Sequence, residues 1–408
     1  MMPPMLLALT SHGNAPYLMA ARLANALGRA AVVIPDYYGD TQRRILLEEL
    51  PDCGDYVWLS SQLGDILRPL LLDVSSGKSF GEFGAQLADA NNPGGAAAIE
   101  NRFQQAIRDG LGIERLDGRE RGLLFKKDIR GVLNSTLPIR PGVGDHIFFF
   151  TGRMSQLYGS LPPGDDSPEA IRTLEQLQGY AEIWRKVEAT FSVSFIPRVN
   201  AFSYRNDMEA DAILTPPLAF RRAESNRLKK PALLFLPSGT RTDVRALNDL
   251  AAQAVNGYER LVLGYQRDGT DFPAAQFSRV NAAVFGDEQL QGVIARGGWG
   301  TVWECLCNEI PLAVPRLGFS DDPEIGHTQL ALRSQGIGLV LEGELAPFLD
   351  ETKREVLKQA IHALRMEDQA IYGALAEDGF AFMATQILDV LPGWAEKFQL
   401  QMTEAVNG

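Results

Sequence analysis

The sequence predicts an α/β protein made of two Rossmann-like domains, each a doubly wound parallel sheet. First, its 408 residues are too many for one ordinary hydrophobic core, so two domains of about 150–200 residues are expected. Second, short apolar runs alternate with helix-forming stretches along the chain, which is the pattern of strand–helix–strand units. Third, Glu224–Pro231 is polar and ends in proline, and a new series of such units begins after it. We therefore place the domain linker there.

The first series opens as a strand, a turn, a helix and a second strand. Met5–Thr10 is short and apolar, as expected of a buried strand. Ala15–Leu27 carries spaced apolar residues among good helix formers, and Gly28 lies just past its end. Ala30–Pro35 is again short and apolar. This order is typical of the start of a doubly wound sheet.

The rest of the first series is less regular. Asn91–Gly95 indicates a loop. Ser167–Thr190 is predicted to be a helix that begins at a serine cap followed by proline. The remaining predicted strands are Asp145–Thr151, Phe191–Ile196 and Asp211–Thr215.

The segment Arg119–Arg130 mixes basic residues with a short apolar run. A solvated helix packed by its apolar side is the favoured interpretation. The alternative is a contact with an anionic membrane surface or with a lipid-linked acceptor.

The second series again alternates strands and helices. Helices are predicted over Asp243–Val255, over 351–365 and near the C-terminus. The predicted strands are Ala232–Pro237, Arg260–Leu263, Ala282–Phe285, Gly292–Ala295, Leu312–Pro315 and Gly338–Leu341.

Composition narrows the classes of partner and compartment. The net charge of −12 argues against nucleic acid as the main partner. The cysteines Cys53, Cys305 and Cys307 have neither metal-site spacing nor the number for a disulfide framework. The N-terminus lacks the basic region of a signal peptide, and no apolar run is long enough to span a membrane. We expect a cytoplasmic protein without a bound metal.

The most informative motif is the segment Arg296–Glu304. Its small residues follow an apolar run and precede a predicted helix, so the backbone can approach a ligand closely. The N–H groups at a helix start favour a phosphate, and Arg296 can add paired charge-assisted hydrogen bonds. Glu304, one turn into the helix, can accept hydrogen bonds from sugar hydroxyls. The donor-loop candidates are Arg296, Gly297, Gly298, Trp299, Gly300, Thr301 and Glu304.

This segment resembles the donor-binding signature of UDP-sugar glycosyltransferases with the two-Rossmann GT-B fold. Gly298-Trp299 match the signature directly, Thr301 stands at the phosphate-binding serine, and Glu304 at the ribose-binding glutamate. Pro311 matches the proline seven residues later. The arginine form with two glycines is closer to the transferase that adds N-acetylglucosamine in peptidoglycan synthesis. The segment between Phe285 and Val293 is too short for the helix that these enzymes have there.

The resemblance extends over residues 292–338 and implies further donor contacts. Gly326–Gln329 resembles the end of the signature, which adds His327 and Gln329 to the donor site, with Gln329 on the sugar. The turn Ser238–Arg241 should face the donor phosphates, through hydrogen bonds from Ser238, Gly239 and Thr240 and charge from Arg241.

The catalytic base is expected in the first domain. The turn of Ser11, His12, Gly13 and Asn14 corresponds to the position where related transferases have a glycine and a histidine, in the opposite order. His12 suits proton transfer near neutral pH. The pair Asp145 and His146, before a strong predicted strand, is the alternative.

The implied organisation is an acceptor-binding domain over 1–225, a donor-binding domain over 226–385, and a helical segment over 386–408 that packs back on the first domain. The implied activity is transfer from a nucleotide-diphosphate sugar, a UDP-sugar in particular, to a hydroxyl of a small molecule, saccharide or lipid. A base implies inversion at the sugar carbon; without one, a retaining mechanism stays open. No cofactor or metal is implied, because the helix start and the arginine neutralise the diphosphate.

Two alternatives remain at this stage. A UDP-sugar 2-epimerase has the same architecture, although it would need acidic residues deep between the domains. A non-catalytic nucleotide-sugar-binding subunit would bind the donor without turnover. Peripheral contact with the inner face of a membrane and the oligomeric state are left open by the sequence.

Overall fold

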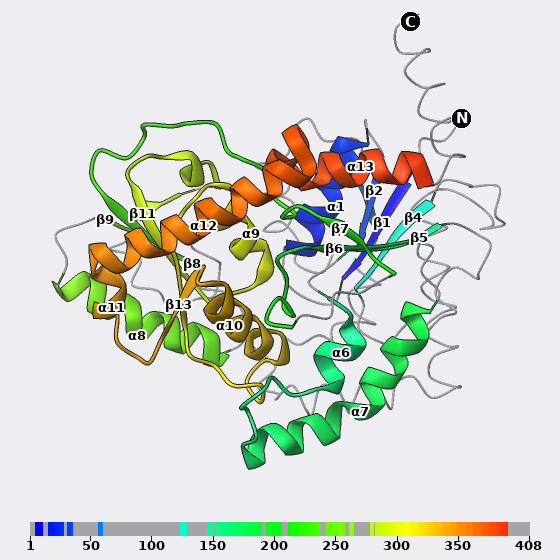
Figure 1. Ribbon diagram of the computed structural model, residues 1–408, viewed down its shortest axis with the longest axis horizontal. Helices are drawn as coiled ribbons and strands as arrows, with labels where there is room; N and C mark the ends of the chain where they lie inside the picture. Colours follow the sequence, from blue (N-terminus) through cyan, green and yellow to red (C-terminus); the bar gives the residue numbers. More distant parts are fainter. Residues whose placement is uncertain are drawn as a thin grey trace, which may run out of the picture.

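A computed structural model shows two parallel sheets side by side, each with its own helices (Figure 1). It describes residues 5–10, 15–27, 31–35, 56–59, 123–128, 145–149, 152–189, 193–205, 211–236, 241–257, 261–264, 278–280 and 282–390.

The first sheet has seven strands in the order β3-β2-β1-β4-β5-β6-β7, and every adjacent pair is parallel. Its strands are β1 (Met5–Thr10), β2 (Ala31–Pro35), β3 (Tyr56–Leu59), β4 (Leu123–Asp128), β5 (Asp145–Phe149), β6 (Val193–Pro197) and β7 (Ile213–Thr215). The strand order reverses at β1, which is the doubly wound arrangement predicted from the first strand–helix–strand unit.

The second sheet has six parallel strands in the order β10-β9-β8-β11-β12-β13. They are β8 (Ala232–Leu236), β9 (Leu261–Gly264), β10 (Ser278–Arg279), β11 (Leu290–Ala295), β12 (Leu312–Pro315) and β13 (Gly338–Leu341). All four residues of β12 and the first four of β8 are buried, as expected where helices cover both faces of a parallel sheet.

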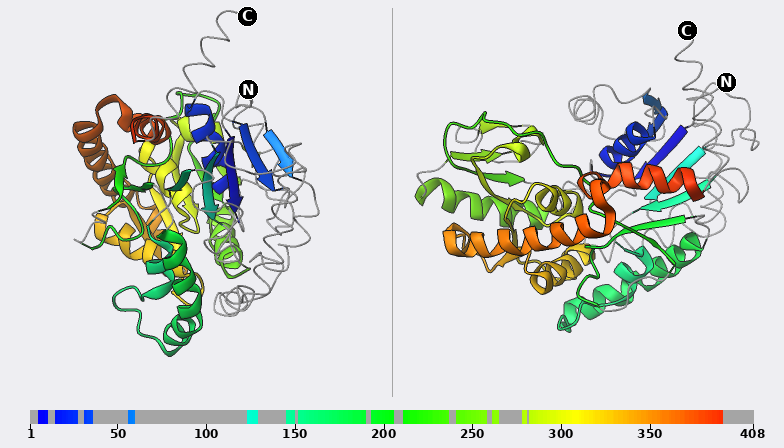
Figure 2. Two further views of the ribbon diagram at one scale, coloured as in Figure 1. Left: turned by 90° about the vertical axis from the view of Figure 1, so that its right-hand side faces the viewer. Right: turned by 45° about the horizontal axis from the view of Figure 1, so that its top comes forward.

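In the part of the first domain that the structure describes, the helices are α1 (Ala15–Ala26), α6 (Met154–Gly159) and α7 (Pro168–Glu188). Those of the second are α8 (Arg241–Gly257), α9 (Trp299–Cys307), α10 (Pro323–Gln335), α11 (Ala346–Leu349) and α12 (Glu351–Tyr372), with the 3₁₀ turns η2 (Ala282–Gly286) and η3 (Gly373–Glu377). After η3 the chain returns to the first domain as α13 (Gly379–Val390), which contacts α1 and β7 (Figures 1 and 2).

Two predictions about elements are wrong. Leu123–Asp128, inside the segment interpreted as a solvated helix, is β4, a central strand between β1 and β5. Its run of two leucines and a phenylalanine matches a buried strand as well as a helix face, and only the sheet decides between them. The stretch predicted as a strand at Ala282–Phe285 is the 3₁₀ turn η2.

Helix α10 begins and ends at residues that suit those positions, although it was not predicted. The Asp322 side chain caps it by accepting from the N–H groups of Glu324 and Ile325, and Pro323 occupies its first turn. Gly336 ends it with φ of 66°, a left-handed conformation that favours glycine.

The chain crosses between the domains twice, and the two crossings touch. The segment that connects β7 to β8, residues 216–231, contains the predicted linker and is called the linker from here on. Phe220 on the linker forms an isolated antiparallel bridge with Asp378, which precedes α13. The N–H of Arg221 donates to the carbonyl of Glu377, and the N–H of Gly379 donates to the carbonyl of Ala219. Backbone hydrogen bonds therefore tie the outgoing and returning segments together.

The linker also docks on the start of the second domain. The carboxylate of Asp287 accepts from Ser225 Oγ and from the N–H groups of Arg227 and Leu228. Burial acts to raise the pKa of Asp287, but these hydrogen bonds leave it lowered. The linker thus fills the position beside the short 285–293 segment, where the sequence leaves no room for a full helix.

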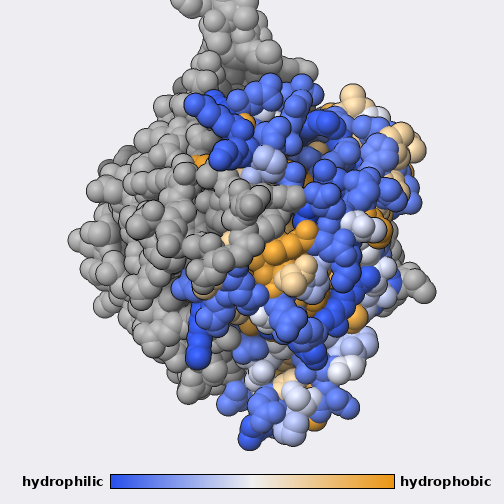
Figure 3. Space-filling model, turned by 90° about the vertical axis from the view of Figure 1, so that its left-hand side faces the viewer, coloured by the Kyte–Doolittle hydropathy of each residue, from blue (hydrophilic) through white to orange (hydrophobic). Residues whose placement is uncertain are grey.

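Among the coloured residues of the face in Figure 3, hydrophilic ones predominate, and an apolar area lies near the middle of the view. Among the described residues, no helix combines the length and apolar character needed to cross a membrane.

We predict that Gly286→Ala destabilises the protein. A Cβ at this position would lie 2.1 Å from the carbonyl oxygen of Ala223, so the linker would have to move. The expected loss is about 1–3 kcal/mol in the free energy of unfolding, measured by urea denaturation. The matched control is Gly159→Ala, where the new Cβ would meet only the Cβ of Ala181 at 3.4 Å. Equal stability of the two variants would contradict the close contact between Gly286 and the linker.

Candidate active site

The segment predicted to bind phosphate forms a loop between β11 and α9. Strand β11 ends at Ala295, and α9 starts at Trp299 with Gly298 as its N-cap. Gly297 has φ of +96°, and a Cβ there would also lie 3.1 Å from Val314 Cγ1. Glycine is therefore required at 297 by both torsion and space.

The start of α9 is suited to an anion. Gly298 has no side chain to cap the helix, so the first-turn N–H groups receive no side-chain cap. Gly300 and Thr301, in that first turn, are partly exposed. Such a helix start stabilises a negative charge by about 0.3–1 kcal/mol at an exposed site.

Arg296 is held at this helix start by a partner that the sequence analysis missed. Its Nη1 lies 2.8 Å from Oδ2 of Asp322, whose other oxygen caps α10. A Cβ on Gly298 would lie 3.5 Å from Arg296 Nε, so the guanidinium lies against the loop. Asp322 thereby orients the arginine and also reduces the net positive charge beside the helix. The Asp-Pro pair before α10 is the sequence signal that could have revealed it.

Glu304 has different partners from those implied by the resemblance. Its Oε1 lies 2.8 Å from Nη2 of Arg22 and 2.9 Å from Nη2 of Arg222, and its Oε2 lies 3.3 Å from Arg222 Nε. The residue is only 7% exposed. The carboxylate predicted to hold ribose is thus part of a buried ion-pair cluster that joins α1, the linker and α9. Neither arginine was identified from the sequence, because both pairs join residues far apart in the chain.

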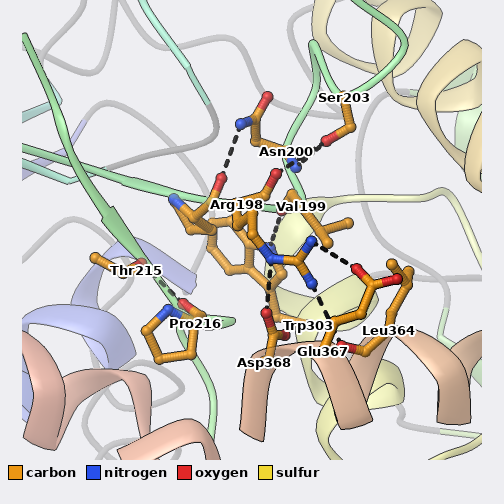
Figure 4. Close-up of polar contacts among 11 residues, drawn as sticks. Arg198, Val199, Asn200, Ser203, Thr215, Pro216, Trp303, Leu364, Glu367 and Asp368 are labelled. Atoms are coloured by element: carbon orange, nitrogen blue, oxygen red, sulfur yellow. Dashed lines mark hydrogen bonds and ion pairs between the residues drawn. The ribbon is translucent and has the colours of Figure 1, made fainter. Parts of the chain in front are cut away.

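The two tryptophans of α9 belong to the core. Trp299 is 2% exposed, and its ring centroid lies 5.7 Å from that of Trp303. Trp303 Nε1 donates to the carbonyl of Val199 in the first domain at 2.9 Å (Figure 4). The side chain of Trp299 therefore packs inside the protein, and only its backbone lies at the loop.

His327 lies buried at the contact between the domains, and its role in the donor site stays a prediction. It is fully buried, its Nε2 donates to the carbonyl of Ser160 at 3.0 Å, and its Nδ1 lies 2.8 Å from the hydroxyl of Tyr204. The ring stacks on Tyr204 and also contacts Phe202 and Phe319. Burial in this aromatic setting lowers the pKa of His327 to about 4. His327 is a neutral contact between the domains.

Gln329 faces the backbone of its own domain. Its Nε2 donates to the carbonyl of Pro315 at 2.9 Å, and the residue is 6% exposed. Its contact with the donor sugar stays a prediction.

Several predicted residues lie outside the described part of the chain. These are Ser11, His12, Gly13 and Asn14 and the turn residues Ser238, Gly239 and Thr240. The backbones of Arg241, at the start of α8, and of Asp145 and His146, at the start of β5, are described, but their side chains are not. Strands β8 and β11 are neighbours, with Leu236 paired to Ala295, so these two strands end side by side.

Comparison with known proteins identifies the fold. No protein-family model and no curated protein sequence matches the chain. Solved structures do match over nearly the whole chain. A Polygonum tinctorium UDP-glucosyltransferase capable of glucosylating indoxyl is 12% identical with a TM-score of 0.59, covering 96% of this chain and 99% of that one.

Two further solved structures match the chain over a similar length. Phytolacca americana UGT2, complexed with UDP-2-fluoro-glucose and pterostilbene, is 12% identical with a TM-score of 0.58, covering 96% of this chain and 100% of that one. The glycosyltransferase SnogD of Streptomyces nogalater is 16% identical with a TM-score of 0.51, covering 95% and 99%. The chain therefore has the GT-B fold that the sequence predicted.

We predict that the stability of the protein falls as the pH drops below about 6.5. Because the pKa of His327 is lowered in the folded state, the unfolded state takes up a proton first, and folding loses stability between pH 6.5 and about 4. The contribution is at most roughly 3 kcal/mol. It is measured as the difference in unfolding free energy between wild type and His327→Gln across this range. Parallel pH profiles of the two proteins would refute it.

Proposed function

We propose that the protein is a glycosyltransferase that moves a sugar from a nucleotide-diphosphate sugar, in particular a UDP-sugar, to an acceptor hydroxyl. The observation that carries the proposal is the loop at the start of α9, where Gly297 requires a left-handed torsion and Arg296 lies beside uncapped N–H groups. The loop occurs in a chain with the GT-B fold.

The chemistry that this loop supports is stabilisation of a leaving diphosphate. Negative charge grows on the diphosphate as the sugar bond breaks, and fixed donors and charges aimed at it lower the barrier. Arg296, the backbone of residues 297–301 and the Thr301 hydroxyl are the proposed donors, with the 238–241 turn beside them. These groups supply the positive charge themselves, so we propose a reaction that needs no metal.

The first domain would supply the catalytic base and bind the acceptor. In the proposed mechanism His12 removes the proton of the acceptor hydroxyl, which then attacks the sugar carbon directly and inverts it. Asp145 and His146 are the alternative base. The acceptor is a small molecule, saccharide or lipid, and the protein is proposed to act in the cytoplasm.

We predict that UDP stabilises the wild-type protein and that Arg296→Lys weakens UDP binding about tenfold, or about 1.4 kcal/mol. Lysine keeps the charge and the pair with Asp322 but loses the planar fork that grips a diphosphate. Isothermal titration calorimetry gives the Kd, and UDP at 100 times that Kd should add about 2.7 kcal/mol of stability.

The matched control is Arg316→Lys, at an exposed arginine of the same domain that pairs with Glu342. Its UDP affinity should equal that of the wild type. If no nucleotide diphosphate shifts the melting temperature at millimolar concentration, the proposed donor site does not exist.

We predict that His12→Ala reduces transfer about 10²–10⁴-fold while leaving UDP affinity nearly unchanged, since a general base acts in the chemical step and not in donor binding. Turnover is measured with a panel of nucleotide sugars and acceptors. Wild-type turnover in His12→Ala would transfer the role to Asp145 and His146, which Asp145→Asn and His146→Ala then test. Donor binding by the wild type without turnover on any acceptor would instead favour a non-catalytic subunit.

A further inference from the structure

We propose that Glu304 is committed to the contact between the domains and does not read the ribose, so that the protein binds ribo- and 2′-deoxyribonucleoside diphosphates about equally. This inference rests on the proposed function, because it concerns the nucleotide specificity of the same donor site. It is carried by the Arg22–Glu304–Arg222 cluster.

The cluster uses both oxygens of the carboxylate. Arg222 approaches with two nitrogens, Nη2 on Oε1 at 2.9 Å and Nε on Oε2 at 3.3 Å, which is the paired geometry that arginine forms with a carboxylate. Arg22 adds Nη2 on Oε1 at 2.8 Å. A ribose hydroxyl would have to compete with two charged donors that are already in place.

All three side chains are withdrawn from water. The side chains of Arg22, Glu304 and Arg222 are 9%, 9% and 11% exposed. The guanidinium carbons of Arg22 and Arg222 lie 4.9 Å and 4.4 Å from the centre of the Phe220 ring, which therefore covers both cations. Charges in such a setting are screened little by water, so the pairs are stronger than the same pairs on the surface.

The cluster is also fixed by its backbone. The N–H of Arg222 donates to Asn308 Oδ1 at 2.8 Å, and Asn308 Nδ2 donates to the carbonyl of Glu304 at 2.8 Å. The linker and the end of α9 are thereby tied together beside the ion pairs. Releasing Glu304 toward a ligand would require the linker and α1 to move, or would separate the carboxylate from two buried guanidinium groups, which is strongly unfavourable.

A neutral hydroxyl cannot compensate for that loss. A hydrogen bond from ribose to the carboxylate replaces a similar bond to water, whereas each buried pair that breaks gives up a charge-assisted hydrogen bond withdrawn from water. Among the described residues, Asp322 is a second carboxylate next to the loop, and it is committed to Arg296 and to the cap of α10. The donor loop therefore recognises the diphosphate, and the 2′-hydroxyl adds little to binding.

The test compares UDP with 2′-deoxy-UDP on the wild-type protein by isothermal titration calorimetry. The expected result is two Kd values within about threefold of each other. UDP binding at least tenfold tighter than 2′-deoxy-UDP, a difference of about 1.4 kcal/mol, would overturn this inference while leaving the proposed donor site intact. Absence of binding by both compounds would overturn the donor site and this inference together.

A variant of Glu304 distinguishes a structural role at the contact between the domains from a role in binding ribose. Glu304→Gln should lower the melting temperature clearly and leave the UDP affinity of the folded protein nearly unchanged. The matched control is Glu342→Gln, which breaks the exposed pairs with Arg316 and Arg333 and should change neither quantity. An unchanged melting temperature with tenfold weaker UDP binding would overturn the inference. If Glu304→Gln does not fold, the structural role is supported and the wild-type comparison decides the specificity.

Discussion

A carboxylate buried between two domains must be neutralised, and much of the contact between the domains follows from how Glu304 meets this requirement. Its partners come from α1 and from the linker, so one ion-pair cluster fixes the first domain, the crossing segment and the helix of the donor loop. Glu304 and Thr301 both lie on α9, so the helix that begins at the donor loop also carries the carboxylate of the contact between the domains. Removing Glu304 would take the shared anion from both buried arginines at once, whereas removing one arginine would still leave the carboxylate paired with the other.

Other contacts between the domains also pair polar groups, through further ion pairs and a hydrogen bond from an indole. The segment after β6 provides most of them (Figure 4). Arg198 pairs with Glu367 and Asp368 of α12, and the carbonyl of Val199 accepts from the indole of Trp303. Burial raises the pKa of Asp368 although Arg198 opposes this. These contacts join the two domains on the side of α9 and α12.

Contacts between the domains also use side chains that the sequence predicts to bind a ligand. His327 and Glu304 both carry groups suited to a sugar or a phosphate, yet each is satisfied by the opposite domain. Arg296 differs, because its partner Asp322 comes from the same domain and holds it against the loop. The burial of a signature residue and the partners that the fold gives it therefore decide whether a ligand can reach it.

The sequence by itself determined the α/β class, the two-sheet organisation and the loop at 296–301. These depend on local properties: short apolar runs, spaced helical positions, and glycines that permit a left-handed torsion. It could not separate the strand β4 from a helix, because a short apolar run suits both and only pairing with β1 and β5 decides. It also could not assign partners to Glu304, His327 and Arg296. Those partners lie far away in the chain, and the tertiary structure alone decided which charges and ring nitrogens meet, because a buried polar group is satisfied by whatever packing brings beside it.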